Sequence, residues 1–253
     1  MSAPGIGRVG IDPTRAGVSF GRTLAVEIRK LFDTRAPLWL LGVMLLGWAA
    51  VSLVMVAGSA TPAFETLVDV LATISRAFVG ILAILLVTGE WGQRAVVTTF
   101  TLEPRRERVV AAKLVAVVAF AMAVTVVVVV LAALLTAVRG GDFGDTGRIV
   151  GAVFVADAFD VLMAVGFGLL FLNTAGAIAA YFVLPETVVP LLLLAGQGHL
   201  DGLGDWLYPR TVLSRLADVG GAGSWAKLLV CAVVWIGIPM LIGIYRVMTR
   251  EVK

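Results

Sequence analysis

Cysteine and histidine are almost absent from this sequence, which contains one of each, Cys231 and His199. A lone cysteine forms no intramolecular disulfide, and a zinc site needs about three or four clustered ligands. The sequence also lacks a G-x-x-x-x-G-K-[ST] loop, the glycine-rich segment whose backbone amides hold nucleotide phosphates. These absences exclude a disulfide-stabilised domain, a Cys/His metal centre and a nucleotide site of that type.

Charged residues are also scarce, at 15% of the chain against about 25% in average soluble domains. Hydrophobic residues make up 60% of the chain, and the mean hydropathy is +1.00. A soluble domain of 253 residues has too small a core to bury so much apolar surface. The composition therefore predicts a membrane protein.

Long runs with few or no charges divide the chain into segments that suit a bilayer, since a spanning helix needs about 20 apolar residues. The sequence predicts an all-α membrane protein with six transmembrane helices, at about residues 38–58, 68–89, 110–138, 150–171, 174–195 and 227–247. We expect residues 20–253 to form one membrane domain, after a disordered tail at 1–19 that is rich in Gly and Pro. The longest external loop is expected at 196–226, with a possible short helix at PRTVLSRLAD.

The distribution of basic residues predicts an orientation. With six spans, the segments on the side of the two termini hold 14 of the 20 basic residues, and the opposite loops hold five. Because cytoplasmic loops carry an excess of Lys and Arg, we expect both termini to be cytoplasmic. The bias toward Arg, Ala, Val and Gly is typical of a GC-rich bacterial genome, so we expect a multi-pass protein of the bacterial plasma (inner) membrane.

Residues 20–35 have the pattern of an amphipathic helix. Hydrophobic side chains share one face, at Phe20, Leu24, Ile28, Leu31 and Phe32. The other faces carry charged side chains, at Arg22, Glu27, Arg29, Lys30 and Asp33. We predict a helix that lies in the cytoplasmic interface of the lipid bilayer. A plain positively charged anchor for the first span is the alternative.

The segment GEWGQRAVVTTFTLEPRRERVVAAK, residues 89–113, carries eight charges in an otherwise apolar chain. In the predicted topology, residues 90–109 form the largest cytoplasmic loop between spans. We expect a helix at Glu90–Leu102 that Pro104 ends, because proline lacks a backbone donor and clashes with the preceding turn. A second helix begins at Arg105 and continues into the third span. A short helix across the cytoplasmic face suits a partner protein, and a charged anchor without a partner is the alternative.

The same segment resembles a known family. The order Glu90, Arg94, Thr98-Thr99-Phe100, Leu102, Pro104-Arg105-Arg106, Arg108 and Lys113 is similar to the first cytoplasmic loop of type-two ATP-binding-cassette (ABC) permeases. The stretch GFGLLFLNTAGAIAA, residues 166–180, is similar to the small-residue turn between the fourth and fifth spans of that family. With its interfacial helix, six spans and long last external loop, the chain resembles an actinobacterial-like export permease subunit over nearly its whole length.

The resemblance implies a permease subunit that forms the substrate pathway as a dimer with an identical or related permease. It implies a separate cytoplasmic ABC ATPase that binds ATP and Mg²⁺, so this chain would hold no cofactor and would not itself be an enzyme. The loop at 90–109 would contain the coupling helix on which the ATPase docks. The implied docking residues are Glu90, Trp91, Arg94, Thr98, Thr99, Phe100, Arg105 and Arg106. The implied activity is the export of a hydrophobic or cationic amphipathic compound.

Four ionisable residues fall inside the predicted spans, at Arg76, Asp157, Asp160 and Glu186. Because a helix rises about 1.5 Å per residue, all four lie at one depth within about 5 Å. Charges at that depth cost about 3 kcal/mol each and usually face protein or water. In one interpretation Arg76 pairs with either aspartate and joins the second span to the fourth. In the other, the surplus acids line a pathway for a cationic amphipathic substrate.

Other functional classes stay open on the sequence alone. An ATPase-independent carrier, channel or membrane scaffold has the same composition. An intramembrane enzyme would have to use the carboxylates of Asp157, Asp160 and Glu186, although no known catalytic motif surrounds them. Binding of nucleic acid is not expected, because basic residues beside a membrane are explained by orientation.

Overall fold

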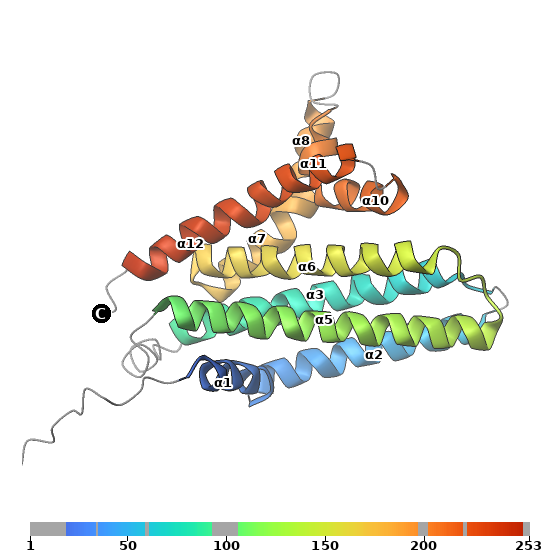
Figure 1. Ribbon diagram of the computed structural model, residues 1–253, viewed down its shortest axis with the longest axis horizontal. Helices are drawn as coiled ribbons and strands as arrows, with labels where there is room; N and C mark the ends of the chain where they lie inside the picture. Colours follow the sequence, from blue (N-terminus) through green and yellow to red (C-terminus); the bar gives the residue numbers. More distant parts are fainter. Residues whose placement is uncertain are drawn as a thin grey trace, which may run out of the picture.

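The computed structural model of the chain describes residues 19–33, 35–58, 61–92, 106–196, 202–219 and 222–249. Every regular element in these residues is helical (Figure 1). The elements are α1 (Phe20–Asp33), α2 (Arg35–Ala57), α3 (Phe64–Gly92), α5 (Arg106–Arg139), α6 (Thr146–Phe171), α7 (Thr174–Val183), the π-helical turn η1 (Leu184–Val188), α8 (Val189–Ala195), α9 (Gly204–Leu207), α10 (Pro209–Val219), α11 (Ala222–Ala232), the π-helical turn η2 (Val233–Gly237) and α12 (Ile238–Thr249).

Six helical segments are long and apolar enough to cross a membrane. They are Arg35–Ala57, Phe64–Glu90, Glu107–Arg139, Thr146–Phe171, Thr174–Ala195 and Gly223–Thr249. The fifth segment combines α7, η1 and α8, and the sixth combines most of α11 with η2 and α12. The prediction of an all-helical fold with six spanning helices is confirmed, and it fits a multi-span membrane protein.

Helices α3 and α6 form the centre of the bundle. In Figure 1 they lie between α2 and α5 on one side and α7 and α12 on the other, and each contacts helices of both groups. In the most apolar stretch of α3 and of α6, 56% of the residues are buried, against 11% in α2. The outer helices therefore expose apolar side chains, as helices in contact with lipid do.

At the end of the bundle where α6 turns into α7, the helices approach closely through glycine. A Cβ atom on Gly243 of α12 would lie only 2.5 Å from Leu169 Cβ of α6. A Cβ atom on Gly168 of α6 would lie 3.2 Å from Val87 Cβ of α3. Larger residues would push these backbones apart, so this half of the bundle is tightly packed.

The turn between α6 and α7 is short and locally fixed. Leu172 ends α6 with φ of 50°, in the left-handed region that non-glycine residues seldom adopt. Asn173 then caps α7, because its side-chain oxygen accepts a hydrogen bond from Gly176 N–H at 2.9 Å. The cap specifies where α7 begins and directs it back along α6.

The segment after the fifth span folds back onto the sixth. The short helix predicted at PRTVLSRLAD is present as α10. Trp235 donates its indole N–H to Leu207 O at the end of α9, at 2.7 Å. Cys231 of α11 is fully buried beside the same carbonyl. These contacts place α9 and α10 over one end of the bundle.

Helix α1 packs mainly on α5 and lies beside the start of α2 (Figure 1). On its predicted apolar face, Leu31 is buried and Leu24 is half-buried. Phe20 and Ile28 of the same face are exposed. Glu27, on a face that the sequence pattern marks as charged, is only 2% exposed. A charged face of α1 thus contacts the bundle, and the position of this helix in a membrane interface stays a prediction.

Candidate functional site

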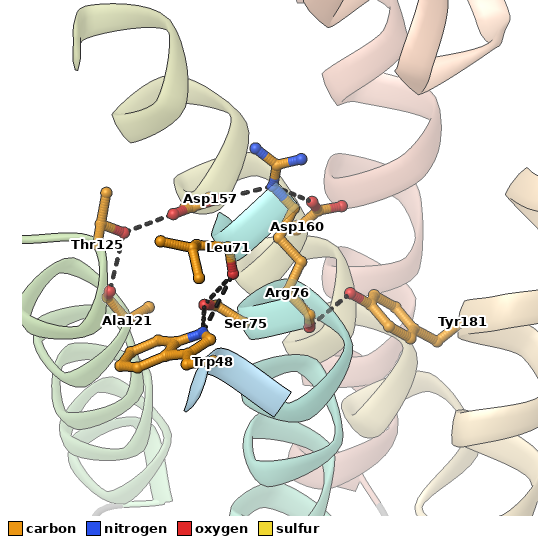
Figure 2. A network of polar contacts seen from close by, with 9 residues as sticks. All are labelled: Trp48, Leu71, Ser75, Arg76, Ala121, Thr125, Asp157, Asp160 and Tyr181. Carbon is orange, nitrogen blue, oxygen red and sulfur yellow. Dashed lines mark hydrogen bonds and ion pairs between the residues drawn. The ribbon is translucent and has the colours of Figure 1, made fainter. Parts of the chain in front are cut away.

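Arg76 of α3 connects the two central helices through contacts with two carboxylates of α6. Its Nε lies 2.7 Å from Asp157 Oδ1 and 3.4 Å from Asp160 Oδ2. The two aspartates are three residues apart and share a face of α6, so both reach the same guanidinium. Figure 2 shows both contacts ending on Nε, while the terminal nitrogens of Arg76 extend beyond the aspartates. The structure therefore brings Arg76 to both aspartates at once.

Asp157 is the more buried of the two aspartates, at 7% exposure. Thr125 of α5 donates its hydroxyl to Asp157 Oδ2 at 2.6 Å, which adds a third helix to the network (Figure 2). Near Arg76, the Ser75 hydroxyl donates to Leu71 O at 2.7 Å. Trp48 of α2 donates its indole N–H to Ser75 Oγ at 3.1 Å. Buried polar groups are costly when unpaired, so this network specifies how four helices pack.

Arg76 and Asp160 also line a cavity of about 710 Å³ between α3, α6, the α7–η1 segment and α10. Sites for small molecules usually enclose about 300–1,000 Å³. The charged residues of its lining are Glu65, Asp69, Arg76, Arg148, Asp160, Glu186 and Arg210. Its larger uncharged residues include Met163, Tyr181, Phe182 and Leu213. The cavity has room for a compound of drug-like size and offers it both apolar and charged walls.

Glu186 lies in the wall of this cavity on η1. Its Oε2 is 3.6 Å from Nε of Arg210 on α10. The two side chains are 43% and 66% exposed, so solvent screens the pair and its contribution to stability is small. Pro185 precedes Glu186 in the π-helical turn, where a missing backbone N–H is tolerated. Glu186 is therefore held loosely enough to pair with a ligand instead.

Tyr181 of α7 closes one end of the cavity. Along α3 the lining extends from Ala63 to Ala77 and ends before Gly80. There the Tyr181 ring packs on the backbone, and a Cβ atom on Gly80 would lie 2.6 Å from Tyr181 Oη. The Tyr181 hydroxyl donates to Arg76 O at 3.4 Å (Figure 2). The absence of a side chain at position 80 thus allows α7 to contact α3 and to end the cavity.

A second charged cluster joins α1 to the last turn of α3 and the early part of α5. Glu27, Lys30, Glu90 and Lys113 form a closed ring of alternating acids and bases, called the ionic ring below. In that order around the ring, the N–O distances are 2.7, 2.5, 3.2 and 2.7 Å. Lys113 also donates to Leu86 O at 3.2 Å. The ring has no net formal charge, which suits its burial.

Burial is deepest on one side of the ionic ring. The side chains of Glu27 and Lys113 are 2% and 8% exposed, whereas Lys30 is 33% exposed. Partial burial disfavours the charged form of Lys30, but hydrogen bonds to Glu27 and Glu90 outweigh that effect. The pKa of Lys30 is therefore raised above its ordinary value of 10.5.

Few of the predicted docking residues fall in the described part of the chain. Glu90 lies in the last turn of α3, 15% exposed, and both of its ion-pair partners are lysines of its own chain. Trp91 belongs to α3, and Arg106 begins α5. The remaining docking residues, Arg94, Thr98, Thr99, Phe100 and Arg105, lie outside the described residues. The coupling helix thus stays a prediction.

Sequence reasoning missed several residues of both clusters. Glu65 and Asp69 lie on the same face of α3 as Arg76 and also line the cavity. Their helical spacing from Arg76 could have been recognised in the sequence. The pairing of Glu27 with Lys113 had no such signal, because 86 positions separate them. Glu90 and Lys113, near the two ends of the charged segment, meet at 3.2 Å.

No protein-family model matches this chain, and no curated protein matches it either. Within the described ranges, no group of three or more His, Cys, Asp or Glu side chains is placed to hold a metal ion. The resemblance to ABC permeases thus rests on the sequence motif. The cavity is the structural feature on which a proposal of function can be based.

Proposed function

We propose that the chain is the transmembrane permease subunit of an ABC transporter in the bacterial plasma membrane. It forms the substrate pathway as a dimer with a second permease copy, identical or related. A separate cytoplasmic ATPase binds ATP and Mg²⁺ and drives transport. The observation that supports transport best is the cavity of about 710 Å³, which is lined by charged residues and lies between helices of a six-span fold.

The charges in this cavity exceed what helix packing requires. A single Arg76–Asp157 pair would already join α3 to α6, since their atoms are 2.7 Å apart. Asp160 and Glu186 add further carboxylates to the cavity wall. In the predicted topology they lie deep within their spans, where each charge costs about 3 kcal/mol on insertion scales. Such residues usually mark a pathway for an ion or a substrate. We therefore favour a translocation pathway over a purely structural lock.

The proposed activity is the export of a hydrophobic or cationic amphipathic compound. ATP hydrolysis belongs to the partner, because the sequence has no phosphate-binding loop of the G-x-x-x-x-G-K-[ST] type. The ATPase docks on the segment between α3 and α5. The ionic ring supports this arrangement, since it braces α1 against both helices that flank the segment.

Reconstitution with a candidate ABC ATPase, sought first among the genes adjacent to that of this chain, tests the proposal. We expect the two proteins to co-purify, and proteoliposomes containing both to move a fluorescent amphipathic cation only when ATP is hydrolysed. Replacing the phosphate-binding lysine of the ATPase should abolish transport. Replacing Arg94 with Ala should lower ATP-driven transport while the permease stays folded.

Two outcomes would contradict the proposal. The first is transport by this chain without any ATPase, which would identify the carrier or channel alternative. The second is a stable, correctly folded chain that neither binds the ATPase nor changes its hydrolysis rate. Circular dichroism and size-exclusion profiles of the purified chain provide the control for folding.

A further inference from the structure

We propose that the cavity binds a lipophilic monovalent cation, with the positive charge held between Asp160 and Glu186. The inference deepens the proposed function and rests on it for the role of the cation in transport. It narrows the ligand to one sign of charge and names the two carboxylates that hold it.

The formal charge of the cavity selects a cation. Four carboxylates line it, from Glu65, Asp69, Asp160 and Glu186, against three guanidinium groups. Asp157 lies directly behind Arg76, at 2.7 Å, and makes a fifth carboxylate. Five acids against three bases leave a formal charge of −2. Such an excess of negative charge in a concave site attracts a positive ligand and disfavours an anion.

Arg76 does not cancel this preference. Its Nε makes the shorter contact with Asp157, and Asp157 also accepts the Thr125 hydroxyl at 2.6 Å. Asp157 thus compensates the positive charge of Arg76. It does so next to α5, away from the cavity wall that η1 forms. Asp160 makes only the longer contact of 3.4 Å, with a side chain that is 20% exposed. Its other carboxylate oxygen has no contact among the residues drawn in Figure 2, and Asp160 lines the cavity.

Glu186 supplies a second carboxylate that a ligand can recruit at little cost. Its contact with Arg210 is 3.6 Å long, and the side chains of Glu186 and Arg210 are 43% and 66% exposed. Exchanging Arg210 for a bound cation therefore loses little energy. Asp160 and Glu186 belong to different elements, α6 and η1, and line the same space. Together they offer a cation a site bounded on two sides.

The remaining wall suits an apolar body attached to that charge. Tyr181 and Phe182 contribute aromatic rings beside the charged residues, and aromatic faces attract organic cations. Met163 adds a flexible, polarisable side chain that adapts to ligands of different shape. A small hydrated ion would gain nothing from these contacts, so the wall favours an organic cation with a large apolar surface.

The test measures equilibrium binding of tetraphenylphosphonium to the purified chain in lipid nanodiscs, without ATPase. Tetraphenylborate has nearly the same shape and the opposite charge, and serves as the matched probe. We expect saturable binding of the cation and no competition from the anion. Asp160→Asn and Glu186→Gln should each weaken binding about tenfold or more. Glu107→Gln, an exposed acid outside the cavity, should bind as the unmodified chain does.

Unchanged affinity in Glu186→Gln would overturn the inference even if Asp160→Asn failed to fold, since the half-exposed Glu186 is dispensable for packing. Equal binding of the anion would overturn the charge selection. Failure of the proposed function is distinguishable, because binding is measured without the ATPase. If the chain binds the cation but no ATPase, only the transporter assignment is refuted. If it binds the ATPase but not the cation, only the proposed cation site is refuted.

Discussion

Lys113 Nζ of α5 lies 2.7 Å from Glu27 Oε2 of α1, and both side chains are almost completely buried. The contact joins a helix that precedes the first span to a helix that begins the third. It makes α1 a part of the bundle and holds it against the start of α5.

Replacing Lys113 with Met should destabilise the protein by about 3 kcal/mol or more, because it leaves the buried Glu27 with Lys30 alone. The measurement is the unfolding midpoint in detergent. Arg29→Met is the matched control, since Arg29 pairs with Asp33 on the surface with 80% and 55% exposure. That control should change stability by less than about 1 kcal/mol. Similar losses in both variants would show that the ionic ring is not a buried unit.

Stability should also fall at high pH through Lys30. Its pKa is raised in the folded protein above the ordinary 10.5. The contribution of Lys30 is therefore fully present below 10.5 and is lost as the pH rises through the higher folded value. A pH series of unfolding midpoints should fall more steeply for the unmodified chain than for Lys30→Gln. Arg29→Gln should retain the steep slope, and equal slopes in all three would contradict the assignment.

A double-mutant cycle on Arg76 and Asp157 should reveal strong coupling. Arg76→Met leaves two carboxylates without their base, and Asp157→Asn removes the partner at 2.7 Å. We expect the double variant to be more stable than the sum of the single losses by about 1–3 kcal/mol. Lys227 and Asp205, 3.4 Å apart and about one-third exposed, provide a comparison pair with coupling below about 1 kcal/mol. Additive losses at Arg76 and Asp157 would refute the buried pair.

Gly80→Ala should disturb the closed end of the cavity. The added Cβ would lie 2.6 Å from Tyr181 Oη and 2.7 Å from Tyr181 Cζ, so the ring must shift. We expect a loss of about 1–3 kcal/mol from overpacking. Adding Tyr181→Leu to Gly80→Ala should recover part of it, whereas Tyr181→Phe should not, because the ring atoms remain. Gly42→Ala, where nothing lies within 4 Å, is the control. Equal stability of Gly80→Ala and Gly42→Ala would show that α7 does not rest on α3 here.

The sequence predicted the elements of this fold better than their contacts. Runs of apolar residues are a local signal, so the six spans were recognisable, and only boundaries such as the start of α3 at Phe64 differ. The sequence also placed Arg76, Asp157 and Asp160 at similar heights along their helices, which agrees with their contacts. That Arg76 reaches both aspartates depends on how α3 and α6 pack, which no local pattern specifies.

The contacts of the ionic ring also could not be predicted from local sequence patterns. Glu27 lies on a charged face of α1, and a helical pattern alone assigns such a face to solvent. Its burial depends on Lys113, 86 positions away, and on the close packing of α1 against α5. Glu90 was recognised as notable from its motif, but its role in holding α1 to α3 and α5 became visible only in three dimensions.

The buried Cys231 has a practical consequence for mapping the molecule. It is the only cysteine in the sequence and is inaccessible, so the natural chain presents no reactive thiol to a reagent. A cysteine introduced at Glu65, on the exposed rim of the cavity, would be the sole target of a membrane-impermeant maleimide. Labelling from one face of sealed vesicles would then show directly which compartment the rim faces, without first preparing a cysteine-free variant.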